Sequence, residues 1–403
     1  MKKIIVSILV IGLLLTTPIV TVNANNQIKN ITENLKKQNN SSNDFLFDLE
    51  IRSLMRIGHF PSLSVCIIKN NSVVWYNGYG RAKFLTKPTI NTVYQIGSIS
   101  KTFTATAMMQ LYEKGLFGLD DNINDYLDFE VKNPKYPDVN ITFRMLLAHQ
   151  SSLAGNNTLG DLGILIDFLR FKEDYPYPLI KRMISPEGDL YSPTVWGNFS
   201  PGSDSCYSCF NFMLLEHLTE VLSNQSFVSY CKENIFNPLN MSNTSFFFND
   251  FRRNQLATSY QNIGNFYFRL PFIDNPYGVG GIKCSIEDLS HYAIAHMNGG
   301  VYDGVRILNE STVDLMHSIQ YENSSYGDKR FGLGWVDWEE LYGIHTHGHV
   351  GHVPGGTTAM WINASNDYAI LFSINGFISL GDKTVVKALD DIDKVFFAKA
   401  KEL

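Results

Sequence analysis

Charged residues are scarce in this sequence, and neither sign of charge dominates. Only 18% of the 403 residues are Asp, Glu, Lys or Arg, and the formal net charge is −6. This balance gives no reason to expect a nucleic acid or an anionic membrane surface as a partner. The sequence also lacks a repeat at any fixed period, and its hydrophobic share of 44% is typical of a globular chain rather than a disordered one.

Cysteine is rare as well. The sequence has five cysteines, and this odd number leaves at least one thiol unpaired within the chain. Cys206 and Cys209 have the spacing of a redox-active pair, but no alternation of strand and helix surrounds them, as a thioredoxin-like site requires. A local disulfide and two buried thiols both remain open for this pair.

The one long apolar run is at the N-terminus. Met1-Lys2-Lys3 precedes an apolar stretch from Ile4 to Val20, and small residues follow up to Ala24. This order predicts a secretory signal peptide over residues 1–24, and the alternative is an uncleaved membrane anchor. Many Asn-x-Ser/Thr triplets suggest a secreted glycoprotein, or one in the lumen of the secretory pathway; examples begin at Asn140, Asn224, Asn243 and Asn363.

The rest of the chain predicts an α+β fold. A polar leader over 25–43 precedes an amphipathic helix from residue 44, and two strands follow at 62–68 and 72–76. Both strands are apolar on each face, which predicts a sheet covered on both sides. Further strand patterns return near the C-terminus, at 345–352, 357–362 and 368–374, before a final helix from about residue 382.

The order of these patterns predicts two parts of the mature chain. Residues 44–115 and 255–403 form a discontinuous domain, an antiparallel sheet flanked by helices whose strands come from opposite ends of the chain. Residues 116–254 are rich in helix and loop patterns, and we expect them to form an inserted helical subdomain.

The chemistry is organised around the segment Tyr94–Lys101. A short extended stretch leads through Gly97 to Ser98 and into a helix that is apolar around most of its circumference, so we expect this helix to be buried. Residues three apart on a helix share a face, which places the Lys101 amine beside the Ser98 hydroxyl. Burial lowers a lysine pKa, so the amine can help to activate the hydroxyl, and the helix N-terminus favours an oxyanion there.

Ser-x-x-Lys alone is a weak pattern, since Ser229 and Lys232 match it equally well. The second copy lies in a mixed polar stretch without the strand and glycine that precede Ser98. We interpret it as a coincidence at the surface.

Several segments in the expected order resemble the penicillin-recognising serine enzymes: class C β-lactamases, D-Ala-D-Ala carboxypeptidases and related esterases. They are Gly97–Ala105 around the serine, Ile141–Leu153 with the His149 segment, Pro201-Gly202 with Tyr207-Ser208, Asn237–Met241, Gly280-Gly281, Gly332–Trp335 and His349–Gly351. This resemblance covers about residues 60–375 and implies a β-lactamase/transpeptidase-like fold.

The resemblance also implies roles for individual residues. Ser98 is the expected nucleophile, Lys101 its hydrogen-bonded partner, and Tyr207 passes a proton between Ser98 and the leaving group, with nearby positive charge adjusting its phenol. His349 takes the place of the lysine that β-lactamases carry, as in the carboxypeptidase- and esterase-like relatives. The backbone N–H groups of Ser98 and of His352, after Gly351, are the expected oxyanion donors.

One position departs from the family pattern. Cys209 replaces the asparagine that binds the acylamido group of the substrate, and a thiol is a weak donor that cannot replace an amide. Acylation of Ser98 remains possible, but we expect an esterase or D-amino-acid peptidase rather than an efficient β-lactamase. The expected substrate is a small ester, amide or peptide, with no cofactor, and the oligomeric state is open.

Two alternatives belong to other functional classes. A catalytically weak or inactive binding protein of the same fold is favoured by Cys209. A metalloprotein is suggested by four closely spaced histidines, His345, His347, His349 and His352, because alternating histidines on one strand face can bind zinc. No carboxylate at ligand spacing supports the metal, and His349 already has a role in the family interpretation.

Overall fold

The computed structural model describes residues 44–83, 85–154, 175–263, 266–322, 329–365, 367–376 and 382–403. The chain divides into two units, Met1–Ser53 and Leu54–Leu403, which are described separately. Described residues of the first unit are helical, in a helix that runs over 44–57. The expected signal peptide and leader lie outside the described residues. Across the described ranges, no helix combines the length and the hydropathy needed to cross a membrane.

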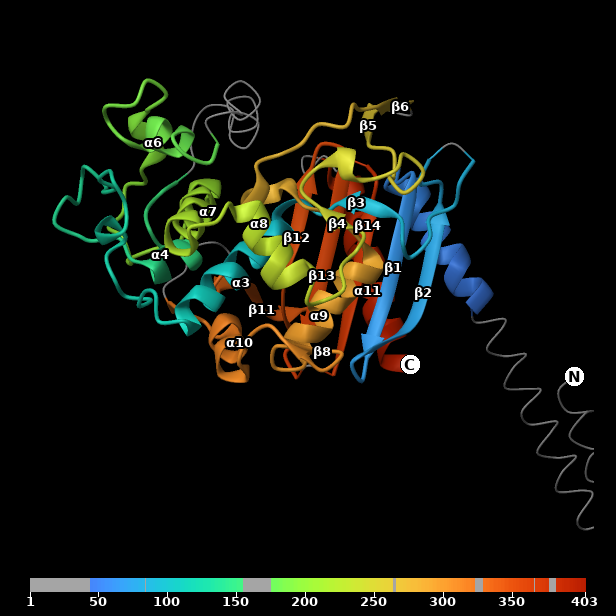
Figure 1. The fold of residues 1–403 in the computed structure, drawn as a ribbon. Helices are drawn as coiled ribbons and strands as arrows, with labels where there is room; N and C mark the ends of the chain where they lie inside the picture. The colour runs from blue at the N-terminus through green and yellow to red at the C-terminus, as the bar shows by residue number, and fades with distance from the viewer. Residues whose placement is uncertain are drawn as a thin grey trace, which may run out of the picture. The chain divides into compact units, whose positions relative to one another are not determined.

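An antiparallel seven-stranded sheet forms the centre of the second unit (Figure 1). Its strand order is β10-β11-β12-β13-β14-β1-β2, so strands from the two ends of the chain meet where β14 pairs with β1. This arrangement confirms the predicted α+β class. The strands are β1 (Ser62–Lys69), β2 (Ser72–Gly80), β10 (Lys329–Phe331), β11 (Val336–Leu341), β12 (Ile344–Val353), β13 (Gly356–Asn363) and β14 (Tyr368–Ile374).

The remaining strands are short and lie in three small sheets. They are β3 (Val93–Gln95), β4 (Thr244–Ser245) and β7 (Lys283–Ser285) in one sheet, β5 (Tyr260–Ile263) with β6 (Phe266–Arg269), and β8 (Val301–Tyr302) with β9 (Val305–Arg306). The α-helices are α3 (Ser100–Glu113), α4 (Phe143–Leu147), α6 (Leu179–Ile184), α7 (Cys209–Ser223), α8 (Phe227–Cys231), α9 (Ile286–Met297), α10 (Glu310–His317) and α11 (Lys383–Glu402).

Helices cover both faces of the large sheet. Successive strand residues point to opposite faces, and on one face the rings of Phe372 and Phe396 bring α11 against β14. On the other face α9 contacts β1, β13 and β14. The two covering helices account for β1, in which the first seven residues are buried.

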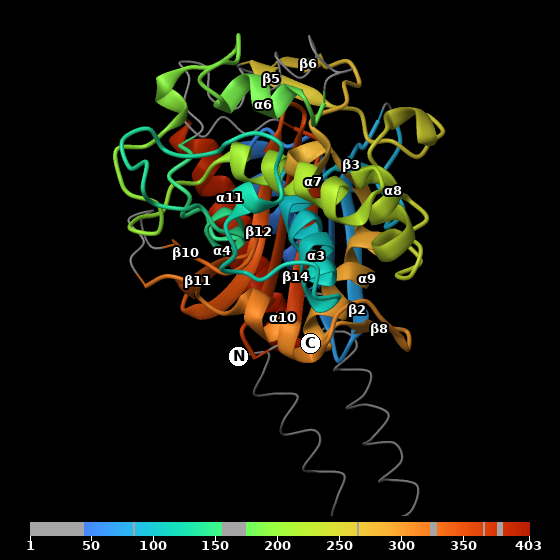
Figure 2. The same ribbon diagram turned by 60° about the vertical axis from the view of Figure 1, so that its left-hand side comes forward.

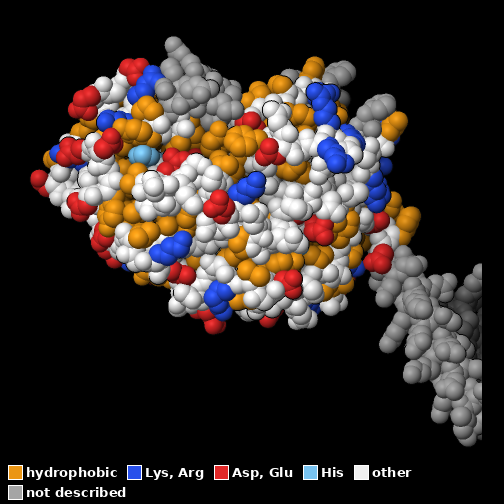
Figure 3. All heavy atoms as spheres, viewed as in Figure 1, with side chains coloured by type: hydrophobic (Ala, Val, Ile, Leu, Met, Phe, Trp, Pro, Cys, Tyr) orange, Lys and Arg blue, Asp and Glu red, His pale blue; other side chains and the backbone are white. Residues whose placement is uncertain are grey.

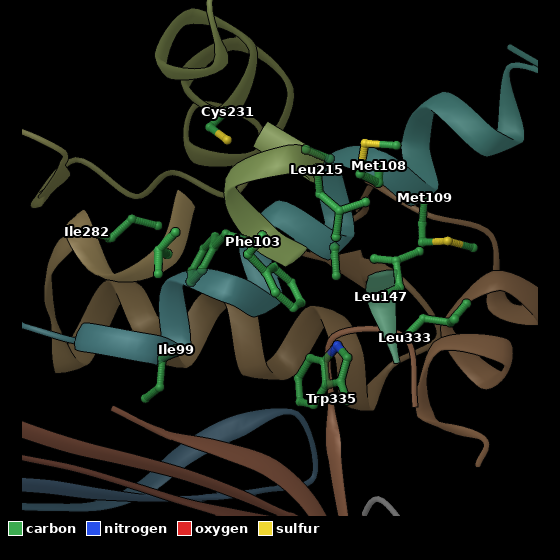
Figure 4. Close-up of a cluster of buried hydrophobic side chains, with 14 of the residues drawn as sticks. Ile99, Phe103, Met108, Met109, Leu147, Leu215, Cys231, Ile282, Leu333 and Trp335 are labelled. Atoms are coloured by element: carbon green, nitrogen blue, oxygen red, sulfur yellow. The ribbon is translucent and has the colours of Figure 1, made fainter. Parts of the chain in front are cut away.

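Helix α3 is the most buried helix of the site region and confirms the pattern read from its sequence. All residues from Ser100 to Leu111 are buried, and Figure 4 shows Phe103, Met108 and Met109 packed among side chains from neighbouring elements. The ring of Phe103 stacks on that of Tyr292 at 3.9 Å between centroids. Figure 2 shows α3 between α7 and the sheet.

Two expectations need correction. Strand β2 is half-exposed rather than covered on both faces, because it is the last strand at one edge of the sheet. Ser98 lies in a 3-10 turn, Gly97–Ile99, which leads directly into α3, and is not in the first turn of the α-helix itself. The proposed boundaries at residues 116 and 254 remain a prediction.

The surface agrees with the balanced composition. The face shown in Figure 3 carries both acidic and basic side chains, scattered among apolar and polar ones.

Candidate active site

The turn that holds Ser98 is built from glycine and a close backbone approach. Gly97 has a φ of +53°, in the left-handed region that favours glycine. A Cβ atom on Gly97 would lie 2.9 Å from the backbone nitrogen of His352, and one on Gly351 would lie 1.9 Å from the carbonyl oxygen of Ile96. These contacts require glycine at both positions and bring strand β12 against the Ser98 turn.

The Lys101 amine is completely buried beside Ser98. Its Nζ donates to Ser98 Oγ at 3.1 Å and to the carbonyl oxygen of Val279 at 2.8 Å, and the residue has 0% exposure. A carbonyl oxygen can only accept, so one N–H of the amine always points to Val279. The bond to Val279 therefore holds the amine in place beside Ser98.

Tyr207 lies close to both residues, on the extended segment before α7. The Lys101 Nζ lies 5.1 Å from the centre of its ring. Burial raises the pKa of the Tyr207 phenol, and the charge of Lys101 and hydrogen bonds with Ser98 and Lys101 offset this only in part. Nearby positive charge was expected to control this phenol, but desolvation is the larger effect. Tyr207 therefore keeps its proton at neutral pH in the free protein.

His149 supports Tyr207, a role that the sequence pattern did not reveal. Its imidazole lies 4.5 Å from the Tyr207 ring between centroids, and its Nδ1 accepts the backbone N–H of Ser208 at 3.1 Å. The carbonyl oxygen of His149 accepts the N–H of Cys206 at 2.9 Å. Burial, and then the charge of Lys101, hold the pKa of His149 well below its usual value, so the imidazole is neutral. Only the contacts show that His149 holds the Tyr207 segment on both sides.

A second supporting group holds the turn Tyr277–Gly281, which supplies the carbonyl of Val279. The side chain of Glu216 accepts the N–H of Gly278 at 2.8 Å and the hydroxyl of Tyr175. The hydroxyl of Thr104 donates to the carbonyl oxygen of Gly278 at 2.7 Å. Burial raises the pKa of Glu216 to about 8. A glutamate in an apolar helix gives no sequence signal for this contact with a distant turn.

The edge of β12 next to Ser98 extends beyond its pairing with β11. The paired residues run from Leu341 opposite Ile344 to Val336 opposite Gly348. His349 follows this point, and its Nδ1–H donates to the carbonyl oxygen of Val350 at 2.8 Å, which leaves Nε2 as the acceptor. The rings of His349 and Tyr207 lie 6.1 Å apart, so His349 lies at the site as expected.

Cys209 is the first residue of α7 and is buried. Its thiol is close enough for its charge, when ionised, to raise the pKa of Tyr207. No disulfide joins the five cysteines, all of which are among the described residues, so the local Cys206–Cys209 bridge is absent.

The four histidines near the C-terminus do not converge. His347 stacks on His317 at 4.0 Å between centroids, whereas the Nε2–H of His345 donates to the Asp337 carboxylate at 2.6 Å. His352 is on the opposite strand face from His345, His347 and His349. Within the described part of the chain, no group of three or more His, Cys, Asp or Glu residues is arranged to hold a metal ion.

A cavity of about 460 Å³ opens at Ser98, Tyr207 and His349. A second cavity of about 620 Å³ is lined by Ser229 and Lys232. Lys232 is exposed, whereas Lys101 is buried. The two copies of the Ser-x-x-Lys pattern therefore differ in the solvation of their lysines.

Comparisons with known proteins identify the family to which the chain belongs. The Beta-lactamase family model matches residues 47–391. A protein of Escherichia coli (strain K12) named as a D-alanyl-D-alanine carboxypeptidase is 26% identical over 344 residues, which cover 72% of this chain and 74% of that protein. Protein flp of Staphylococcus aureus (strain MRSA252) is 24% identical over 339 residues, which cover 81% of this chain and 62% of flp.

Solved structures show the same fold. The octameric penicillin-binding protein homologue from Pyrococcus abyssi superposes with a TM-score of 0.67 at 24% identity, over 87% of this chain and 76% of that chain. The D-stereospecific amidohydrolase from Streptomyces sp. has a TM-score of 0.64 at 21% identity, over 84% of this chain and 97% of that chain. The family model matches most of the length of this chain, and the solved structures share its fold. The chain therefore belongs to the beta-lactamase family of serine hydrolases.

Proposed function

We propose that the chain is a secreted serine hydrolase that cleaves a small ester, amide or peptide through an acyl-enzyme on Ser98. The observation that carries this proposal is the fully buried Lys101 amine, 3.1 Å from Ser98 Oγ and beside the ring of Tyr207. A buried amine next to a hydroxyl is the arrangement that makes a serine nucleophilic.

The proposed reaction begins with attack of Ser98 Oγ on the substrate carbonyl carbon. The hydroxyl proton passes to the Lys101 amine, which accepts it in its neutral form, and the N–H groups of Ser98 and His352 bind the oxyanion. Tyr207 then donates its phenolic proton to the leaving group as the carbonyl–leaving-group bond breaks, and Lys101 returns a proton to Tyr207. Water, activated by the same groups, attacks the acyl-enzyme and releases the acid and free Ser98.

The substrate we propose is an ester or a D-amino-acid peptide rather than a penicillin. Cys209 in place of asparagine removes the amide donor for an acylamido group. The names of the carboxypeptidase and amidohydrolase relatives support amide and peptide substrates.

A fluorophosphonate probe for active serines tests the proposal. We expect covalent labelling of the mature chain that disappears in Ser98→Ala and persists in Ser229→Ala, the matched control from the other Ser-x-x-Lys pattern. Absence of labelling in the unmodified chain would support the binding protein instead. Short esters, D-amino-acid peptides and a chromogenic cephalosporin then rank the substrates.

Secretion is tested separately. N-terminal sequencing of the chain recovered from a eukaryotic secretory host should begin at Asn25, after the predicted signal peptide. A chain that begins at residue 1 and remains with the membranes would favour the anchor.

A further inference from the structure

The cavity at Ser98 continues well beyond the residues of the reaction. From Ser98 and His349 it extends to Tyr342, Asp390 and Asp393, on the face of the sheet that α11 covers. We call this extension the α11 groove. Its walls come from β11, β12, β13, β14 and α11, and its volume together with the active site is about 460 Å³.

The strand register explains why the groove and the site are continuous. Val350 is opposite Ala359, and Ala359 is opposite Phe372, so these three side chains point to the same face. His349 points to the other face, where Tyr207 lies. Pairing with β11 ends at Gly348, and the cavity is lined from both faces beyond this point, by His349 on one face and by Val350 and Ala359 on the other.

The position of α11 leaves room for the groove. Phe396 of α11 contacts Phe372 of β14 and Trp75 of β2, toward the far side of the sheet from β11. Ala359 lines the strip between α11 and β11 with a small side chain, and larger apolar side chains form its walls. The apolar walls are Val336, Trp338, Leu341, Trp361, Val386 and Leu389.

Apart from His352 and Thr357, which lie near the site and are hydrogen-bonded to each other, the polar groups of the groove are at its far end, where they are engaged with each other. Trp361 Nε1 donates to Asp393 at 2.9 Å, and the Tyr342 hydroxyl donates to Asp390 at 3.2 Å. The nearby Lys394 amine lies 5.4 Å from the centre of the Tyr342 ring. Beyond His352 and Thr357, a long apolar chain would therefore pass apolar walls until its tip reaches the hydrogen-bonding groups at the far end.

We propose that the α11 groove binds the acyl chain of the substrate, and that the preferred substrates carry a long apolar acyl group rather than acetyl. This inference rests on the proposed function and adds the substrate class. The acyl side is favoured because the groove leaves the site past Val350 and His352, next to the expected oxyanion donors. Tyr207, which would protonate the leaving group, approaches from α7 instead.

A series of p-nitrophenyl esters from acetate to octanoate tests the groove. We expect kcat/KM to rise by up to about fourfold for each added methylene that enters it. Val386→Phe, which fills the groove from a half-buried position on α11, should lower the octanoate-to-acetate ratio at least tenfold. Lys387→Phe, on the adjacent exposed position of the same helix, should leave the ratio unchanged. Leu389→Ala should shift the optimum to longer chains.

Several outcomes would overturn the inference. If kcat/KM did not change with acyl chain length, the groove would not bind the acyl chain. If acetate hydrolysis were then still lost in Ser98→Ala, the proposed function would stand. If kcat/KM rose instead with the length of the alcohol chain in a series of acetate esters, the groove would bind the leaving group. If no ester is hydrolysed, the change in Tm on addition of octanamide tests the groove instead. The inference requires that octanamide raises Tm, that Val386→Phe abolishes this rise and that Lys387→Phe retains it.

Discussion

The imidazole of His149 lies against the ring of Tyr207 and accepts the N–H of the next residue, Ser208. His149 itself has a φ of +57° and is 2% exposed. The left-handed region is uncommon for any residue other than glycine, and a buried side chain there persists only where its surroundings require it. The position of the Tyr207 phenol thus depends on a residue that need not touch the substrate.

His149→Asn should lower kcat by about tenfold, with little change in KM. Asparagine tolerates the left-handed backbone but lacks the ring that Tyr207 rests on. The pH dependence of kcat should change as well, because the phenol loses its fixed surroundings. His291→Asn, which removes a histidine from the far side of α9, serves as the control, and equal kcat in both variants would contradict the role of His149.

Gly351→Ala should lower kcat on any substrate by about 10²–10³-fold. The added methyl group would lie 1.9 Å from the carbonyl oxygen of Ile96 and 2.9 Å from the Ser98 nitrogen, so β12 must move away from the Ser98 turn. Steady-state kinetics measure the effect, and circular dichroism checks the fold. Gly343→Asn, at the β11–β12 turn where nothing lies within 4 Å, is the matched control. Full activity of Gly351→Ala would show that this approach is not needed.

Cys209→Asn should raise the rate of acylation by a chromogenic cephalosporin by roughly tenfold, the effect of about one hydrogen bond. The new amide can bind the acylamido group that the thiol cannot. Stopped-flow absorbance of the cephalosporin measures the rate. Cys209→Ser, which lacks the amide, should not show the gain. An unchanged or lower rate in Cys209→Asn would contradict our account of this position.

Glu216→Gln should stabilise the protein selectively at alkaline pH. Burial raises the pKa of Glu216 to about 8, from an ordinary value of 4.5, so its contribution to stability is complete below pH 4.5 and is lost as the pH rises to 8. The loss is at most about 1.4 kcal/mol per pH unit. Glutamine keeps the acceptor for Gly278 without a charge. Thermal melts at pH 6 and pH 9 should therefore show a smaller decrease in Tm for the variant, and parallel decreases would refute this.

A cluster of buried histidines should make the protein less stable at acid pH. Burial lowers the pKa of His347 to about 4 and that of His296 to about 3, and His317 between them is also shifted well below its usual value. The unfolded chain binds protons at these positions near pH 6.5. Stability is therefore lost as the pH falls from 6.5 toward 4, by up to about 1.4 kcal/mol per pH unit for each histidine.

His347→Phe should reduce this acid sensitivity, since its ring can stack on His317 without a proton site. Urea unfolding at pH 7 and pH 4.5 measures the difference in the free energy of unfolding between variants. His345→Gln, at a half-exposed position of the same strand, removes only the second cause of the His347 shift and should retain most of the acid sensitivity of the unmodified chain. Equal acid sensitivity of His347→Phe and the unmodified chain would exclude the cluster as the cause.

The parts of the fold that sequence patterns predicted are those in which one periodicity dominates. The final helix was predicted from about residue 382, and α11 begins at Lys383 with Asp382 as its N-cap. The apolar circumference of α3 and the nearly continuous apolar run of β14 gave equally direct signals. Strand β2 was predicted, but its partial exposure was not, because apolar residues alone do not distinguish an edge strand from a central one.

The site was predicted only as far as local spacing and resemblance reach. Ser98 and Lys101 are three residues apart, and Tyr207 was placed beside them by resemblance alone. The supports could not be predicted, because Glu216 with Gly278 and His149 with Ser208 are contacts between distant segments of ordinary composition. The raised pKa of Tyr207 depends on how completely it is desolvated, which no motif records.

The pairing of β14 with β1 joins the last strand of the sheet to the first. A ribosome must therefore release nearly the whole polypeptide before the sheet can close and before β12 can reach the Ser98 turn. Such non-local pairing folds slowly and leaves strand edges uncovered during synthesis. The nascent chain thus has no complete Ser98 site until its C-terminal strands have been made.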